Sequence, residues 1–161
     1  MNKVQILATG FEFMKEGIRG IEPVIEELIN SAQEEIHIMA YIFTPSALHI
    51  LHLLNYAAER GVKITMVVNR IEFQDEQIKA WLNSAGKKFP HVRVVNFCNP
   101  EGRQLHAKVI VSDRNRALVG SANFSWGGMV ANYEIGILLE GDLAWKLAEL
   151  IDMFISDVVK T

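Results

Sequence analysis

Strand-like and helix-like segments alternate along almost the whole chain. The strand-like segments are short apolar runs, and the helix-like segments repeat apolar residues with a period near 3.6. We expect strands at residues 4–9, 35–43, 62–69, 91–97, 105–111, 117–119 and 134–140. We expect helices at residues 21–32, 45–60, 75–86, 124–131 and 142–159. This alternation predicts an α/β sandwich, with a mixed, mostly parallel sheet flanked by helices.

Length and composition limit the class of protein. The chain has 161 residues and shows no internal repeat, linker or low-complexity segment, so we expect one domain over residues 1–161. Half of the residues are apolar, which argues against disorder, and no apolar run is long enough to span a bilayer. The single cysteine, Cys98, excludes an internal disulfide framework. A single cysteine suits a reducing compartment, and together with the lack of a signal-peptide pattern it predicts a cytoplasmic location.

Residues 105–123 hold most of the residues suited to chemistry. His106 and Lys108 are two residues apart in an alternating apolar run, so on a strand both side chains point to the same face. The segment continues with spaced polar and small residues: Asp113, Gly120, Ser121 and Asn123. A solvent-facing His-x-Lys pair on a strand would explain the alternation, but not the spacing of the later residues.

These residue types suit the chemistry of a phosphodiester. Neutral imidazole is a nucleophile that forms a covalent phosphoryl intermediate, which assigns that role to His106. Lys108 can place a cation on a non-bridging phosphate oxygen, and Asn123 can donate an amide N–H to another. Gly120 lets the backbone come close. A transferring phosphate would be surrounded by fixed donors, and we expect neither a metal nor a cofactor.

The spacing His-x-Lys-x4-Asp-x6-Gly-Ser-x-Asn resembles the signature of the phospholipase D superfamily, the HKD phosphodiesterases. Glu134, in the sequence Asn-Tyr-Glu, also fits, because a carboxylate at this place in the family hydrogen-bonds a catalytic histidine. The resemblance implies a phospholipase D-like sandwich and a metal-independent phosphodiesterase. It assigns catalysis to four residues and substrate binding to Ser121. Gly120 and Asp113 are expected to be structural, with Asp113 holding the end of the strand. The four catalytic residues are His106, Lys108, Asn123 and Glu134.

The motif occurs once, and this count predicts symmetry. Family members with two copies pair them to build one active site from two histidines, so a single-copy chain must form a homodimer to do the same. One His106 would attack phosphorus, and the other would protonate the leaving oxygen. Water would then hydrolyse the phosphohistidine, with one covalent intermediate per dimer.

The substrate is indicated less directly. The net charge of −3 does not attract nucleic acid by itself, but basic residues gather near the motif, and Arg103 is the best candidate for a phosphate contact. Tyr41, near the carboxyl end of its strand, either lines the substrate site or packs in the core. Compact single-motif members of the superfamily resemble endonucleases. A nuclease with a DNA or RNA substrate is therefore the prediction.

Two other functions stay open. One is hydrolysis or transphosphatidylation of a phospholipid or another small phosphodiester. The other is a nucleic-acid-binding subunit with weak activity, beside a helicase or restriction-type partner. His49 and His52 share one helix face and could bind a metal, but no third ligand lies nearby in the sequence, which favours a solvated face. Phe124 and Trp126 flank Asn123 and either stack on bases or pack under the loop.

Overall fold

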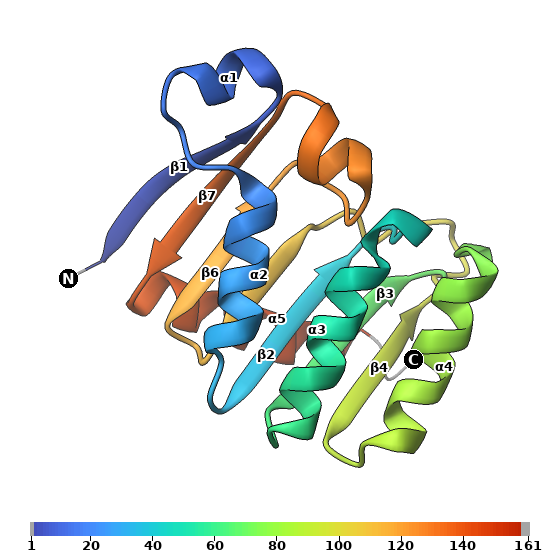
Figure 1. Ribbon diagram of the computed structural model, residues 1–161. Coiled ribbons are helices and arrows are strands. Elements are labelled where there is room, and N and C mark those ends of the chain that lie inside the picture. The colour runs from blue at the N-terminus through green and yellow to red at the C-terminus, as the bar shows by residue number, and fades with distance from the viewer. Residues whose placement is uncertain (1, 159–161) are drawn as a thin grey trace.

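A seven-stranded sheet lies between two layers of helices in the computed structural model, which describes residues 2–158 (Figure 1). The spatial order of the strands is β1-β7-β6-β5-β2-β3-β4. The strands are β1 (Lys3–Thr9), β2 (Glu35–Ala40), β3 (Lys63–Asn69), β4 (Val92–Phe97), β5 (Val109–Ser112), β6 (Arg116–Gly120) and β7 (Glu134–Glu140).

The longer helices cover both faces of the sheet. α2 (Ile21–Ser31), α3 (Leu48–Glu59) and α4 (Glu76–Lys88) lie in front of the sheet in Figure 1, and α5 (Asp142–Asp157) crosses behind it. The shorter helical turns are α1 (Phe11–Lys15), η1 (Pro45–Ala47), η2 (Ile71–Phe73) and the π-helix η3 (Gly127–Ala131). No helix within residues 2–158 combines the length and the apolar character needed to cross a bilayer.

The predicted α/β sandwich with a mixed sheet is confirmed, but the expectation of mostly parallel pairing is wrong. Only β2–β3 and β3–β4 pair in parallel, while β1–β7, β7–β6, β6–β5 and β5–β2 pair antiparallel. Helical crossovers through α3 and α4 produce the two parallel pairs. From β5 onward the chain forms a hairpin and a meander without a long crossover helix, so those strands run antiparallel.

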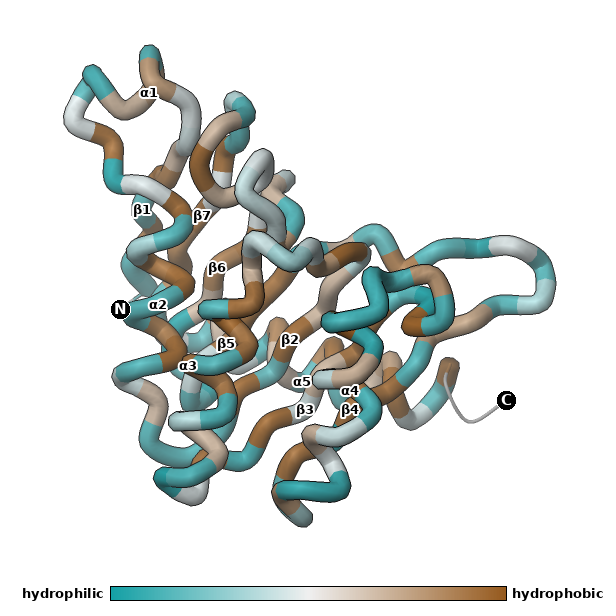
Figure 2. The backbone as a smooth tube through the Cα atoms, turned by 45° about the vertical axis from the view of Figure 1, so that its right-hand side comes forward, coloured by the Kyte–Doolittle hydropathy of each residue, from teal (hydrophilic) through white to brown (hydrophobic). Residues whose placement is uncertain are grey.

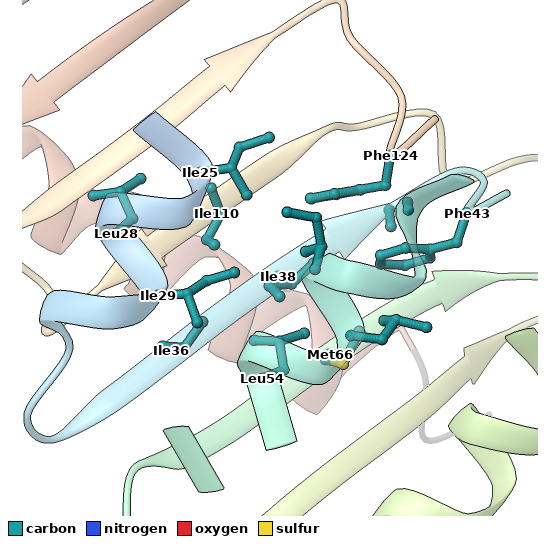
Figure 3. Packing of buried hydrophobic residues seen from close by; sticks show 14 of the residues in the cluster. Ile25, Leu28, Ile29, Ile36, Ile38, Phe43, Leu54, Met66, Ile110 and Phe124 are labelled. Atoms are coloured by element: carbon teal, nitrogen blue, oxygen red, sulfur yellow. The ribbon is translucent and has the colours of Figure 1, made fainter. Parts of the chain in front are cut away.

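Each of the two faces of the sheet packs against helices in its own apolar core. In Figure 3, Ile29 of α2 lies beside Ile36 of β2, and Leu54 of α3 lies near Met66 of β3. A second cluster on the opposite face joins the neighbouring strands to the inner side of α5. The hydropathy colours of Figure 2 match this arrangement, with brown segments along the sheet and teal segments on the outer turns.

Most predicted elements are present, with shifted ends. The strand that follows the motif histidine begins only at Val109, so His106 and Lys108 lie in the segment that leads into β5 rather than on the strand itself. The expected helix at 124–131 is reduced to the π-helix η3. The expected last helix ends at Asp157, and its predicted end at residue 159 lies outside the described residues. α1 was not predicted.

Candidate active site

The motif residues other than Asp113 meet at one edge of the sheet. β5 and β6 form a hairpin in which Val109 pairs with Val119, so the start of β5 lies beside the end of β6. β7 begins at the same edge, because Gly120 pairs with Gly136. Tyr41 follows the end of β2 there. The topology therefore gathers residues that are up to 93 positions apart in the sequence, from Tyr41 to Glu134.

His106 and Lys108 contact each other directly. Lys108 Nζ lies 3.0 Å from Nδ1 of the His106 ring and donates a hydrogen bond to the His106 carbonyl oxygen at 2.8 Å. The His106 ring packs against Tyr41, with 4.6 Å between ring centroids. His106 is exposed, so its imidazole is held from two sides and is still open to solvent. A histidine that is held in this way and open to solvent is suited to act as a nucleophile.

Lys108 is a buried cation, with only 8% of the residue exposed. Burial lowers the pKa of its ammonium group, and the Glu134 carboxylate offsets part of this shift. The ammonium lies 5.5 Å from the centroid of the Tyr41 ring, which adds a cation–π contact. A partly desolvated cation interacts strongly with an anion that reaches it, so Lys108 is suited to a phosphate oxygen.

Glu134 is held by Ser121, whose hydroxyl donates a hydrogen bond to the Glu134 carboxylate. Within residues 2–158 no hydrogen bond joins Glu134 to His106. Gly120 makes the close approach of β6 and β7 possible, because a Cβ at this position would lie 2.6 Å from the carbonyl oxygen of Ile135. The structure thus brings the carboxylate to the site without pairing it to the histidine of the same chain.

Asn123 contributes an amide to the same edge. Its Oδ1 is buried and lacks a hydrogen-bond partner. Its backbone lies so close to Gly128 that a Cβ on that glycine would be 2.3 Å from the Asn123 carbonyl oxygen. The next residue, Phe124, is buried and stacks on Phe43 at 4.6 Å between centroids, whereas Trp126 is 61% exposed. The Asn123 loop is therefore anchored in the core on one side and open on the other.

Asp113 lies at the opposite end of β5. Its carboxylate accepts hydrogen bonds from the backbone N–H groups of Gln33, Glu34 and Glu35, at 2.8–2.9 Å. These bonds hold the turn that leads into β2. The turn after β5 uses the left-handed region, with φ values of 50° at Asp113 and 52° at Arg114.

The predicted phosphate contact, Arg103, forms an ion pair on the exposed segment before the motif. Its guanidinium pairs with Glu101 at 2.9 Å, and 77% of its side chain is exposed. Arg114 is engaged by Glu35 and Asp152, and Arg116 by Glu27. These ion pairs neutralise much of the positive charge that residues 103–116 carry.

The sequence interpretation missed two residues beside the site, Arg70 and Phe73. Both line a cavity that Tyr41 also borders. Neither residue belongs to the motif, and only their position just after a buried strand could have indicated them, since ligand sites gather where such strands end.

Among residues 2–158, one group of side chains could hold a metal ion, and it lies between α2 and α3. Ligand atoms of Glu22, Glu26 and His49 all lie within 4.8 Å of one another, with His49 Nε2 at 2.8 Å from a Glu22 oxygen. The expectation that His49 has no third ligand overlooked α2, because the sequence does not show which helix packs beside it. His52 is exposed and is not part of this group.

Comparison with known proteins gives consistent matches. A family model described as cardiolipin synthase, PLD-like domain, matches residues 25–157. DISARM protein DrmC of Bacillus paralicheniformis is 31% identical over 143 residues, which are 88% of this chain and 58% of that protein. Cardiolipin synthase A of Yersinia pseudotuberculosis is 27% identical over 154 residues, which are 95% of this chain and 30% of that protein. The chain thus spans less than two thirds of either relative.

Solved structures of similar size share the fold. Nuc from Salmonella typhimurium, a phospholipase D family member, superposes with a TM-score of 0.74 at 25% identity, covering 94% of this chain and 93% of Nuc. NucT from Helicobacter pylori superposes with a TM-score of 0.77 at 19% identity, covering 99% of both chains. The family match includes the whole motif, and we conclude that this chain belongs to the PLD-like domain family of the phospholipase D superfamily.

Proposed function

We propose that this chain is a metal-independent phosphodiesterase, a homodimeric nuclease that cleaves DNA or RNA through a phosphohistidine. One observation carries the proposal. The exposed His106 has Lys108 at 3.0 Å from its ring, but Glu134 binds Ser121 instead of His106, and Oδ1 of Asn123 is unpartnered. These residues form half of a nucleophilic site, because within residues 2–158 no base and no carboxylate hydrogen-bonds the His106 ring.

The second half comes from a second copy. His106 of one protomer attacks phosphorus, and the P–O bond to the leaving group breaks. His106 of the partner subunit, in its protonated form, donates a proton to the leaving oxygen. The same partner histidine then takes a proton from water, which attacks the phosphohistidine and releases the phosphate monoester. Lys108 and Asn123 of the protomers stabilise the charge on the non-bridging oxygens.

An apolar rim beside the half-site supports dimerisation. The segment between Asn123 and the middle of β7 exposes large side chains, and Trp126 and Tyr133 are each 61% exposed. Val130 and Ile135 are also exposed along this segment. Exposed large apolar side chains are typical of interfaces, and we infer a two-fold axis that passes near this segment and near His106.

Mixing experiments test the shared site. Wild-type protein is unfolded and refolded with the His106→Ala variant at equal concentrations. If each active site needs two histidines, only wild-type homodimers are active, and total activity falls to about a quarter of that of the same total amount of wild-type protein. Independent sites would retain about half. The matched control uses His52→Ala, an exposed histidine on α3, which should leave the total activity unchanged.

The substrate class is tested with a panel. Single-stranded DNA, duplex DNA, RNA and vesicles containing phosphatidylglycerol are incubated with the protein, with and without EDTA. We expect cleavage of nucleic acid in the presence of EDTA. The likeness to Nuc supports this expectation, while the match to cardiolipin synthase A favours the second candidate, a phospholipid transferase or hydrolase. Turnover of phosphatidylglycerol without nucleic acid cleavage would establish that alternative.

A further inference from the structure

A cavity adjoins the half-site formed by His106, Lys108 and Asn123. Its volume is about 280 Å³, and its walls include Tyr41, Arg70, Phe73, Gln74 and Gln104. Tyr41 belongs to both sites, because its ring also packs against His106 at 4.6 Å. A group in this cavity is therefore one side chain away from the proposed nucleophile. The volume is at the small end of the range for ligand pockets, which suits one nucleoside.

Arg70 stands at the cavity with an unusual backbone. Its φ of 42° lies in the left-handed region, which is unfavourable for a residue other than glycine. This backbone conformation is stabilised by the Arg70 N–H, which donates a hydrogen bond to the Phe97 carbonyl oxygen at 2.8 Å. The guanidinium Nε is buried and has no hydrogen-bond partner. Arg70 forms no ion pair with any residue from 2 to 158, although its charge contributes to lowering the pKa of the neighbouring Glu72 carboxyl. Its Nε is therefore available to a ligand.

Phe73 supplies an aromatic face beside this cation. It lies at the end of η2 and is 74% exposed, the largest value among the exposed large apolar residues of the described chain. The Arg70 guanidinium carbon lies 5.7 Å from the centroid of the Phe73 ring. An open phenyl ring next to an unpaired guanidinium presents one surface for stacking and one for an anion.

The walls of the cavity are fixed before any ligand arrives. The buried Gln74 side chain accepts from the Phe43 N–H at 3.0 Å and donates to the carbonyl oxygens of Tyr41 and Asn69, at 3.1 and 2.9 Å. Asn69 Oδ1 in turn accepts from the N–H of Leu105 at 2.9 Å, next to His106. The turn that carries Arg70 and Phe73 is therefore tied both to Tyr41 and to the motif segment. A preformed pocket binds its ligand with a smaller ordering cost.

We propose that this cavity binds the nucleotide next to the scissile phosphate in a single-stranded nucleic acid. The base stacks on Phe73, and Arg70 binds the phosphate that follows. A single strand is favoured because a base must be unstacked from its neighbours to reach an aromatic side chain. This inference rests on the proposed nuclease function and assigns its substrate class to two residues outside the motif.

The test separates the base from the phosphate. Binding of fluorescent oligothymidylate is measured by anisotropy in the His106→Ala background, which prevents cleavage, and is compared with an abasic oligonucleotide of the same length. Phe73→Ala should weaken oligothymidylate binding about tenfold and abasic binding less than twofold. Arg70→Gly, which removes the side chain but suits the left-handed backbone, should weaken both ligands.

Two matched controls guard against general effects. Phe11→Ala removes another exposed phenyl with a cation above it, since Lys15 Nζ lies 4.2 Å from the Phe11 ring centroid. Arg93→Ala removes an exposed arginine near the start of β4, away from the cavity. Neither change should alter binding of either oligonucleotide. Circular dichroism of each variant verifies that it is folded.

The outcomes distinguish the two proposals. If wild-type protein cleaves oligonucleotides but Phe73→Ala and Phe11→Ala behave alike, the nucleotide site is wrong and the nuclease function stands. If wild-type protein binds oligothymidylate through Phe73 but does not cleave it, the nuclease function is wrong, and the cavity is a nucleotide-binding site without a scissile phosphate. A loss of binding to phosphatidylglycerol vesicles in Phe73→Ala, with no change for oligothymidylate, would overturn the site in favour of a lipid.

Discussion

The two ends of β5 belong to one motif and differ in how their polar atoms are satisfied. At the Asp113 end, the carboxylate accepts three backbone N–H groups, all within 2.9 Å. At the His106 end, an exposed imidazole, a buried ammonium and an amide oxygen without a partner lie together. The hydrogen bonds at the Asp113 end stabilise the fold, whereas the polar groups at the His106 end remain able to bind a ligand.

Because of this difference, mutations at the two ends of β5 should affect different properties, turnover at one end and stability at the other. Changes near His106 should alter turnover with little loss of stability, because few protein contacts depend on those atoms. Changes at Asp113 should do the reverse. A variant that alters both properties in equal measure would break the comparison.

The largest effect is expected for His106→Ala. Loss of the nucleophile should lower kcat by at least about a thousandfold, while the melting temperature stays within about 2 °C of the wild-type value. Steady-state cleavage and thermal unfolding monitored by circular dichroism measure the two quantities. His52→Ala is the control and should retain full activity. Substantial residual turnover in His106→Ala would remove this residue from the reaction.

Lys108→Met should separate stability from activity. Removing the cation from the phosphate site should lower kcat by about a hundredfold or more. Because burial lowers the pKa of Lys108, its charged form is unfavourable in the folded protein, and methionine of similar shape should raise the melting temperature by a few degrees at pH 7. Lys146→Met, an exposed lysine on α5, should show neither change.

The sign of the pH dependence sharpens this prediction. A lysine with a lowered folded-state pKa binds its proton less tightly in the folded than in the unfolded protein. The penalty is fully present below that lowered pKa and disappears as pH rises toward 10.5, the ordinary value. The advantage of Lys108→Met should therefore shrink over this alkaline range. An advantage that is constant with pH would show that packing, not charge, causes it.

Asp113→Ala should act at the other end of the strand. Three N–H groups would lose a charged acceptor, which costs about 2–3 kcal/mol and lowers the melting temperature by roughly 5–10 °C. The specific activity of the folded fraction should change less than twofold. Asp113→Asn keeps one acceptor oxygen and tolerates the left-handed backbone, so it should recover part of the stability. A large fall in the kcat of folded Asp113→Ala would contradict a structural place for this residue.

The spacing of the motif was enough to predict which residues gather at the site. Hairpin pairing of β5 with β6 places Lys108 near the end of β6, and the β6–β7 pairing adds Glu134. The hydrogen-bond partner of Glu134 was not predictable. It depends on the register that sets Ser121 beside the start of β7, and a family resemblance does not show which contacts form within one chain and which form between two.

Neither the mostly antiparallel pairing of the sheet nor the cavity beside Tyr41 could be predicted from the sequence, and the reasons differ. Residues 98–108 and 121–133 are long connections, and apolar periodicity does not show whether they reverse the chain or cross over. Arg70 adopts a positive φ that no residue preference predicts for arginine. Its closeness to Tyr41 follows only from the parallel pairing of β2 with β3.

The smallest effect is expected for Ser121→Ala, and it distinguishes two roles. The Ser121 hydroxyl donates to Glu134, so the residue positions that carboxylate if the contact persists during turnover. Its loss should lower kcat about fivefold, the usual worth of one hydrogen bond, and leave KM unchanged. A direct contact with substrate would raise KM instead. Ser84→Ala, on the outer face of α4, controls for the loss of a serine hydroxyl and should change neither constant.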